Sequence, residues 1–120
     1  MIPERMGKYK KEKGSWGEDR AAEYLQGQGY VIRERNFRGK TGEIDIIAEK
    51  DGTIHFVEVK TRTSEDMGEP LEAIDERKLR HILRTSQLYL YRNDLFDRYV
   101  SIDGIGITGD ELEHIEGITI

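Results

Sequence analysis

The chain has 120 residues, with 24 Asp and Glu against 19 Lys and Arg, and a formal net charge of -5. This length suits one domain and excludes two large ones. The absence of cysteine excludes disulfides, thiolate catalysis and zinc sites built on Cys. Neither a secretory signal nor a membrane span is predicted, so we expect a soluble, cytoplasmic protein. The acidic total gives no first reason to expect a nucleic-acid partner.

The N-terminal residues 1–14 are basic and lack periodicity. They are interpreted as a solvated tail, with a phosphate-contacting arm as the alternative. Residues 15–120 are expected to form a single domain. Its first helix is predicted over residues 16–27, because Ser15 and Glu18 have the spacing of a capping box and Ala21, Ala22 and Leu25 form an apolar stripe.

Three strands are predicted after this helix, over residues 30–37, 43–49 and 54–61. The second and third are joined by Asp51-Gly52, a strong hairpin signal. A long helix capped by Asp75 is expected to run to about Tyr91, with a basic flank. Residues 99–102 follow as a strand, and 112–120 as another strand or an irregular closing segment. The order αβββαβ predicts an α/β sandwich around one mixed sheet flanked by helices.

The predicted hairpin places several charged side chains on one face of the sheet. If opposed residues across Asp51-Gly52 have numbers that sum to 103, Asp45 faces Glu58 and Glu43 faces Lys60. Ile44, Ile46, Val57 and Val59 are then expected on the other face. Two opposed carboxylates repel each other, and a divalent cation such as Mg²⁺ would relieve the repulsion. Spacing alone leaves open the alternative of a surface cluster in which Lys60 merely neutralises its neighbours.

The wider sequence around this hairpin resembles a known family. Asp45 followed by Glu58-Val59-Lys60 resembles the signature of the PD-(D/E)XK nucleases, and Glu-x-Lys alone is a weak motif. The surrounding segments resemble the YraN-like family of small bacterial proteins, which are similar to Holliday-junction resolvases. These segments are Gly17 to Ala22, Gly29-Tyr30, Arg35-Asn36, Gly42 to Ala48, Phe56 to Arg62 and Lys78. The resemblance covers roughly residues 14–92.

The resemblance implies a restriction-endonuclease-like fold and a metal-dependent endonuclease acting on DNA phosphodiester bonds, with branched structures as expected substrates. It implies Mg²⁺ or Mn²⁺ bound by Asp45, Glu58, the Val59 carbonyl and Glu18, with Lys60 assisting a water molecule. Glu18 has a competing role as the capping-box partner of Ser15. A homodimer is compatible with the same resemblance. Phosphate contacts are expected from Arg33, Arg35, Arg38, Lys40, Arg62 and Lys78.

One position departs from the family pattern. Val100 stands where the family commonly has an acid after Arg98-Tyr99, which puts the substrate preference in doubt. The segment Gly104 to Gly109 matches GxGxxG but lacks the following helix of a dinucleotide site, so it is interpreted as turns. His55, His81 and His114 share no metal-ligand spacing, and His55 is expected to be a packed histidine.

The charge is unevenly divided along the chain. Residues 99–120 hold five acids and no Lys or Arg, so this segment carries the whole net charge of -5. Net charge therefore does not exclude a nucleic-acid partner for the rest of the chain. Two alternatives to a nuclease stay open: a non-catalytic nucleic-acid-binding or adaptor module of the same fold, and a protein-interaction domain that uses the acidic segment.

Overall fold

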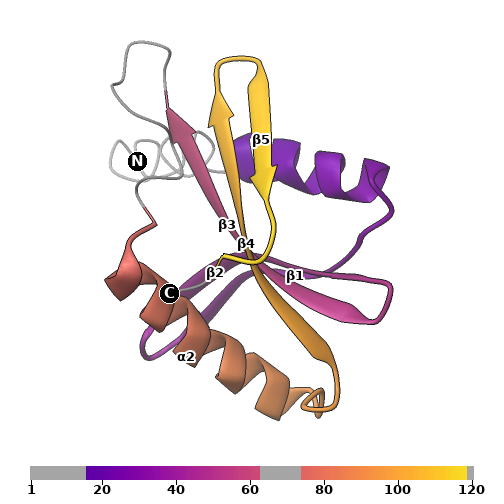
Figure 1. The fold of residues 1–120 in the computed structure, drawn as a ribbon, viewed down its shortest axis with the longest axis vertical. Coiled ribbons are helices and arrows are strands. Elements are labelled where there is room, and N and C mark those ends of the chain that lie inside the picture. Colours follow the sequence, from indigo (N-terminus) through magenta and orange to yellow (C-terminus); the bar gives the residue numbers. More distant parts are fainter. Residues whose placement is uncertain (1–15, 63–73, 119–120) are drawn as a thin grey trace, which may run out of the picture.

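The computed structural model describes residues 16–62 and 74–118, so the predicted tail over 1–14 and the Ser15 cap lie outside the described residues. A helix spans residues 16–27. The other elements are β1 (Val31–Gly39), β2 (Gly42–Lys50), β3 (Thr53–Arg62), α2 (Glu76–Arg92), β4 (Tyr99–Thr108) and β5 (Glu111–Ile115), as Figure 1 shows. No helix within these ranges is long and apolar enough to span a membrane.

The strands form one mixed sheet in the order β1-β2-β3-β4-β5. Strands β3 and β4 pair in parallel, and the other neighbours are antiparallel. Asp51 and Gly52 join β2 to β3 with positive φ angles of 51° and 80°, which suits a tight two-residue hairpin turn. Lys50 pairs with Thr53 and Ile46 with Val57, so the predicted register is confirmed from Ile46 to Lys50. The ladder does not reach the expected pairs of Asp45 with Glu58 and of Glu43 with Lys60. The predicted α/β fold is likewise confirmed.

The two helices cover opposite faces of the sheet, each over its own apolar cluster. Ile46 and Val57 pack in a cluster with Ala21 and Leu25 of the first helix. The neighbouring Ile47 and Phe56 pack instead with α2, through residues that include Leu79 and Ile82. Since successive side chains of a strand point to opposite faces, the sheet is sandwiched between the helices. Burying a side chain the size of Phe56 stabilises the fold by roughly 1.5–3 kcal/mol.

Helix α2 begins where the sequence predicts. Asp75 is its N-cap, and its side chain accepts a hydrogen bond from the Lys78 backbone N–H at 2.9 Å. The buried residues of α2 recur at helical spacing and include Leu79, Ile82, Ser86 and Leu90. This stripe turns one face of α2 to the core and leaves Lys78 free to reach the end of β3.

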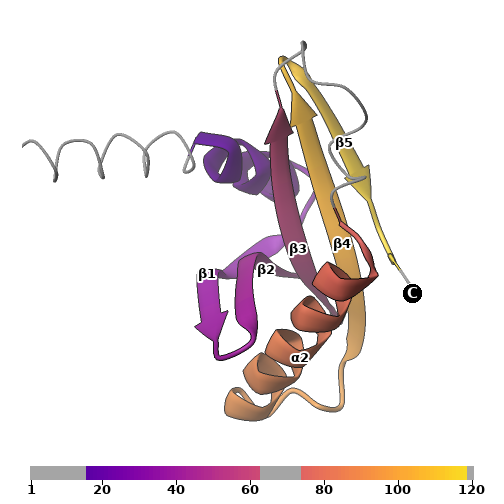
Figure 2. The same cartoon turned by 90° about the vertical axis from the view of Figure 1, so that its left-hand side faces the viewer.

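The expectation that Ile44 shares a face with Ile46 is wrong. Ile44 packs in the α2 cluster, whereas Ile46 packs against the first helix. The reason is that β2 leaves β3 beyond the pair Ile46 and Val57, where the ladder between them ends. Figure 2 shows the β1–β2 hairpin diverging from the long strands β3 and β4. Simple alternation therefore fails at the residues that precede Ile46.

The interpretation of residues 104–108 as turns is also wrong. Strand β4 extends to Thr108 and pairs with β3 along its whole length, from Thr53↔Tyr99 to Arg62↔Thr108. Only Gly109 of the GxGxxG segment has the positive φ, 60°, that a turn requires of a glycine there. Pairing with a central strand outweighs the weak strand preference of Gly104 and Gly106.

Candidate functional site

The candidate site begins where β2 and β3 part. The Val59 backbone N–H donates a hydrogen bond to Asp45 Oδ2 at 2.7 Å, so a side chain of β2 takes the place of the next backbone contact. The N–H and C=O of one strand residue point to the same side of the strand. The Val59 carbonyl therefore also faces the side on which Asp45 lies, as its predicted role as a ligand requires.

Glu58 supplies a buried carboxylate beside Asp45. Its residue is only 4% exposed, and its Oε1 lies 3.5 Å from Lys60 Nζ and 3.2 Å from Lys78 Nζ. Among the described residues, its Oε2 has no hydrogen-bond partner although it is buried. A buried polar oxygen without a partner is costly, so this atom is suited to an additional positive ligand.

A third carboxylate comes from the first helix. The orientation of the Asn36 amide that satisfies both of its polar atoms places its nitrogen 2.7 Å from Glu18 Oε1 and 3.0 Å from Glu43 Oε1. Asn36 adopts a φ of 55° within β1, a conformation that Asn tolerates better than most residues. This bend turns the amide toward Glu18 and Glu43, and so links the helix to the strands.

Burial and the charges of neighbouring acids raise the pKa of two carboxyl groups in the site. Burial, followed by the charge of Glu58, raises the pKa of Asp45 to about 7, although the Val59 N–H opposes the shift. Burial also raises the pKa of Glu18, with Arg35 opposing and Glu43 adding to the rise. A carboxyl group poised near neutral pH by burial and by like charges is typical of functional sites.

The neighbouring strand β4 presents glycines beside two of these side chains. The parallel register pairs Glu58 with Gly104 and Lys60 with Gly106. Because a glycine has no side chain, β4 adds none next to the glutamate or the lysine. The stretch that resembles a nucleotide-binding loop in the sequence thus lines the candidate site as part of a strand.

The predicted phosphate-contacting residues separate into three groups. Arg33 is paired with Glu49 at 2.7 Å, and Arg35 with Asp19 at 2.7 Å, so both already neutralise acids of this chain. Arg38 and Lys40 lie exposed at the β1–β2 hairpin. Two further residues belong to elements that build the site: Lys78 contacts Glu58 from α2, and Arg62 ends β3.

The donor set fits a hard divalent cation. Asp45, Glu58 and Glu18 offer carboxylate oxygens, which Mg²⁺ prefers along with water and phosphate, and Glu58 Oε2 is the buried oxygen that needs a partner. The three carboxylates do not all lie within 4.8 Å of one another; in residues 16–62 and 74–118 that spacing is met by His55, Asp103 and Glu116.

Sequence reasoning missed two members of this arrangement, Asn36 and Glu43, as site residues. A signal existed for Asn36, since Asn is depleted in strands and enriched at positive φ. Glu43 was expected to face Lys60, but it contacts Arg38 at 3.4 Å and the Asn36 amide instead. The divergence of β2 from β3 explains the difference.

Comparison with known proteins identifies relatives that all belong to one family. A model described as "Uncharacterised protein family UPF0102" matches residues 17–107, which include Glu18, Asp45, Glu58 and Lys60. A UPF0102 protein of Persephonella marina is 49% identical over 104 residues, which cover 87% of this chain and 90% of the relative. One of Syntrophomonas wolfei is 45% identical over 97 residues, covering 81% and 84%. One of Clostridium perfringens is 43% identical over 102 residues, covering 85% and 84%.

Proposed function

The chain belongs to the uncharacterised protein family UPF0102, the YraN-like family that its motifs predict, and we propose that it is a metal-dependent nuclease that cleaves DNA. The observation that carries the proposal is the meeting of Asp45, Glu58 and Lys60 where β2 and β3 diverge. A surface cluster would not need a nearly buried glutamate with an unpartnered oxygen, nor an aspartate whose pKa is raised to about 7.

Asp45, Glu58 and the Val59 carbonyl would hold the cation, with Glu18 next to them on the first helix. When bound, Mg²⁺ or Mn²⁺ supplies positive charge to a phosphodiester and lowers the pKa of a bound water. The Val59 N–H fixes the Asp45 carboxylate through its hydrogen bond of 2.7 Å. This contact orients one ligand before any substrate arrives, which is the preorganisation that catalysis requires.

Lys60 is the proposed catalytic cation. Its Nζ is 3.5 Å from Glu58 Oε1, and its side chain is about a third exposed, so it can reach a phosphate from solvent. An ammonium group there would orient a water molecule and stabilise the negative charge that develops on the phosphate. Glu18, whose pKa is raised by burial, would accept a proton from that water.

The substrate phosphates would be held by basic residues on both sides of the carboxylates. Lys78 lies on α2, and its Nζ is 3.2 Å from Glu58 Oε1 on β3. Arg38 and Lys40 extend from the β1–β2 hairpin. Contacts of this kind bind the backbone of DNA without reading its sequence. They favour recognition by shape, in agreement with the branched substrates that the resemblance implies.

Cleavage assays with labelled DNA test the proposal. Four-way junctions, flaps, duplexes and single strands are each incubated with tag-free protein and MgCl₂ or MnCl₂. Asp45→Asn and Lys60→Ala should each lower the rate by at least about 100-fold, because each removes charge that acts on the reacting phosphate. Asp51→Asn is the matched control, since this exposed turn residue undergoes the same chemical change outside the site.

The outcomes separate the proposal from its rival. Unchanged cleavage in both site variants would place the activity elsewhere. A wild-type protein that binds these DNAs with a steep salt dependence, takes up no Mn²⁺ and cleaves none of them would instead be a non-catalytic binding module. Calorimetric titration of wild type and Asp45→Asn with Mn²⁺ decides between these two readings independently of the substrate chosen, because only uptake that depends on Asp45 belongs to the candidate nuclease site.

A further inference from the structure

A second group of polar side chains lies away from the candidate nuclease site. It consists of His55 on β3, Asp103 on β4, His114 on β5 and Glu116 just after β5, and is called the histidine cluster below. His55 and Glu58 are three residues apart on one strand, so their side chains point to opposite faces of the sheet. The histidine cluster is therefore distinct from the carboxylates that face Lys60 and Lys78.

Asp103 is the centre of the histidine cluster. It is fully buried, and its Oδ2 lies 2.8 Å from His55 Nδ1 and 2.9 Å from His114 Nε2. Its Oδ1 accepts a hydrogen bond from Ser101 Oγ at 2.6 Å. Although burial opposes ionisation, the hydrogen bonds from His114, His55 and Ser101 hold the pKa of Asp103 well below its usual range. The core thus contains a fixed negative charge bordered by two imidazoles.

The spacing within the histidine cluster is that of a metal site. Ligand atoms of His55, Asp103 and Glu116 all lie within 4.8 Å of one another. Two ligands that each stand about 2.0–2.1 Å from one ion are roughly 3–3.5 Å apart, and the 2.8 Å between His55 Nδ1 and Asp103 Oδ2 is close to this range. We propose that His55, Asp103 and Glu116 bind a divalent transition-metal ion of the Zn²⁺ class. Binding would release to solvent the proton that His55 Nδ1 shares with Asp103, because a ligating imidazole nitrogen must be deprotonated.

The ligand types select this class of ion. One imidazole with two carboxylates suits Zn²⁺ and its neighbours, whereas Mg²⁺ takes oxygen ligands in preference to nitrogen. The remaining histidine has a supporting role. His114 Nε2 contacts Asp103 on the same oxygen as His55, and a hydrogen bond from an imidazole to a ligating carboxylate holds that carboxylate in position.

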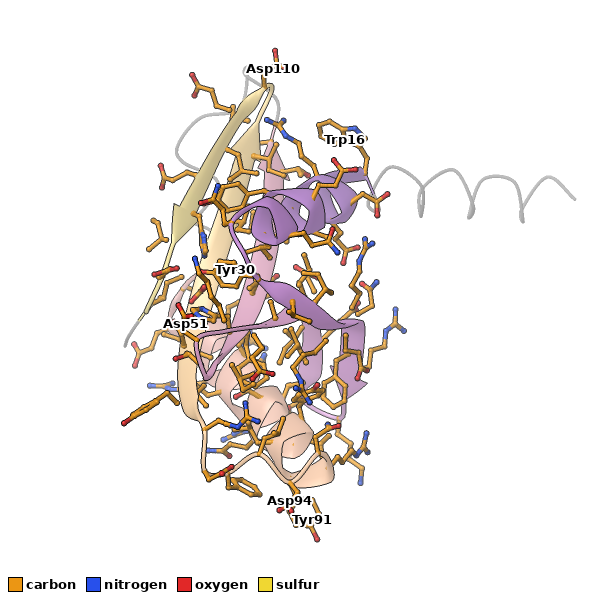
Figure 3. The ribbon with its side chains drawn as sticks, turned by 90° about the vertical axis from the view of Figure 1, so that its right-hand side faces the viewer. Trp16, Tyr30, Asp51, Tyr91, Asp94 and Asp110 are labelled. Atoms are coloured by element: carbon orange, nitrogen blue, oxygen red, sulfur yellow. The ribbon has the colours of Figure 1, made fainter. Side chains whose placement is uncertain are left out.

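The residues around the histidine cluster give an ion access to it and orient Glu116. A cavity of about 370 Å³ borders His55, Ser101 and Glu116, so an ion and its water molecules can enter from solvent. Tyr30 and Asp51, both labelled in Figure 3, border the same cavity. The Tyr30 hydroxyl donates a hydrogen bond to Glu116 Oε1, and burial together with this bond raises the pKa of Tyr30. The phenol therefore stays protonated and directs the exposed Glu116 side chain.

The ion would join segments that are distant in the sequence. His55 and Asp103 belong to strands paired in parallel, while Glu116 lies on the segment that follows the last strand. That segment is held to the sheet by the Ile118 backbone N–H, which donates to the Ile102 carbonyl at 2.7 Å. A metal bound to the folded arrangement alone would raise the free energy of unfolding in proportion to its occupancy. This site would fasten the end of the chain to the centre of the sheet.

Zn²⁺ titration of tag-free protein tests the proposal. The protein carries Asp45→Asn to remove binding at the other site, is treated with EDTA and dialysed, and is titrated calorimetrically with Zn²⁺ in excess MgCl₂. We expect one Zn²⁺ per chain. Glu116→Gln should weaken the affinity by at least about 10-fold, whereas Glu113→Gln, an exposed residue of β5 with the same change in charge, should leave it within about twofold. Because Glu116 is exposed, its variant is expected to fold.

Two further readouts accompany the calorimetry. Co²⁺ in place of Zn²⁺ should give visible absorption typical of nitrogen and oxygen ligands, and Glu116→Gln should reduce it. Saturating Zn²⁺ should raise Tm by at least about 5 °C, again dependent on Glu116. Absence of Zn²⁺ binding, or equal affinity of the Glu116→Gln and Glu113→Gln proteins, would leave the histidine cluster as a hydrogen-bond network alone and overturn the proposal. Neither result bears on DNA cleavage.

Discussion

Replacing Asp45 with Asn should make the metal-free protein more stable at neutral pH. The Asp45 carboxyl group is surrounded by other acids, and burial followed by the charge of Glu58 raises its pKa to about 7. Asparagine keeps an oxygen that can accept the Val59 N–H, which now donates to Asp45 Oδ2 at 2.7 Å. The substitution therefore removes both the cost of burying a charge and its repulsion by Glu58, and it retains the hydrogen bond.

The size of the effect follows from linkage between proton binding and folding. A pKa that rises from 3.8 in the unfolded chain to about 7 in the folded chain corresponds to about 4 kcal/mol at pH 8, at about 1.4 kcal/mol per unit. Asp45 is only partly buried, so water reduces both the burial cost and the repulsion, and we expect roughly half of this value, about 2 kcal/mol. The folded state holds this proton more tightly than the unfolded state. The stability of the wild-type protein should consequently fall as pH rises from about 4 to about 7, and then level off.

Urea unfolding followed by circular dichroism, in EDTA and at several pH values between about 4 and 8, measures this difference. Asp45→Asn and wild type should be equally stable near pH 4, and the variant should become the more stable protein as pH rises. Asp51→Asn should follow the wild-type curve. Added Mg²⁺ should stabilise wild type and not the Asp45 variant. A variant that is no more stable than wild type at pH 8, or a difference that does not change with pH, would refute the reasoning.

Two other substitutions test how the site is positioned. A side chain on Gly17 would place its Cβ 2.5 Å from Thr61 Cγ2, so Gly17→Ala should lower the free energy of unfolding by about 1–3 kcal/mol by pushing the first helix from β3. The control Gly27→Ala, with nothing within 4 Å, should leave that free energy unchanged or raise it by up to about 1 kcal/mol. Equal urea midpoints for the two variants would contradict this packing. Asn36→Gly should keep the fold, because glycine accepts a φ of 55°, yet it should weaken Mn²⁺ binding by about 10-fold through loss of the amide between two carboxylates. Asn36→Ala should both destabilise the fold and weaken Mn²⁺ binding. Calorimetry showing full Mn²⁺ affinity in the glycine variant would rule out this role of Asn36.

The parts of the fold that the sequence predicts correctly are set by local chemistry. Asp51-Gly52 fixes the turn and therefore the register of β2 with β3. Asp75 fixes the start of α2 through its hydrogen bond to the Lys78 backbone. Because the register follows from the turn, the sequence alone predicts the proximity of Asp45 and Glu58.

The parts that sequence reasoning misplaced depend on distant segments. Ile44 changes face because β2 leaves β3, and the alternation of residues in β2 does not predict this separation. Gly104 and Gly106 are in a strand because β3 pairs with them across an intervening helix. His55, Asp103 and Glu116 meet through this same parallel pairing, so spacing along the chain gave no indication of the histidine cluster.

Strand β3 serves both faces of the protein with alternate residues, Glu58 toward Lys78 and His55 toward Asp103. Slipping a strand by one position exchanges its two faces. A single inserted or deleted residue between Lys50 and Thr53 would therefore turn the glutamate toward the first helix and the histidine toward α2. Both proposed metal sites would be lost together. We expect an insertion or deletion in this turn to be tolerated less well than a substitution within it.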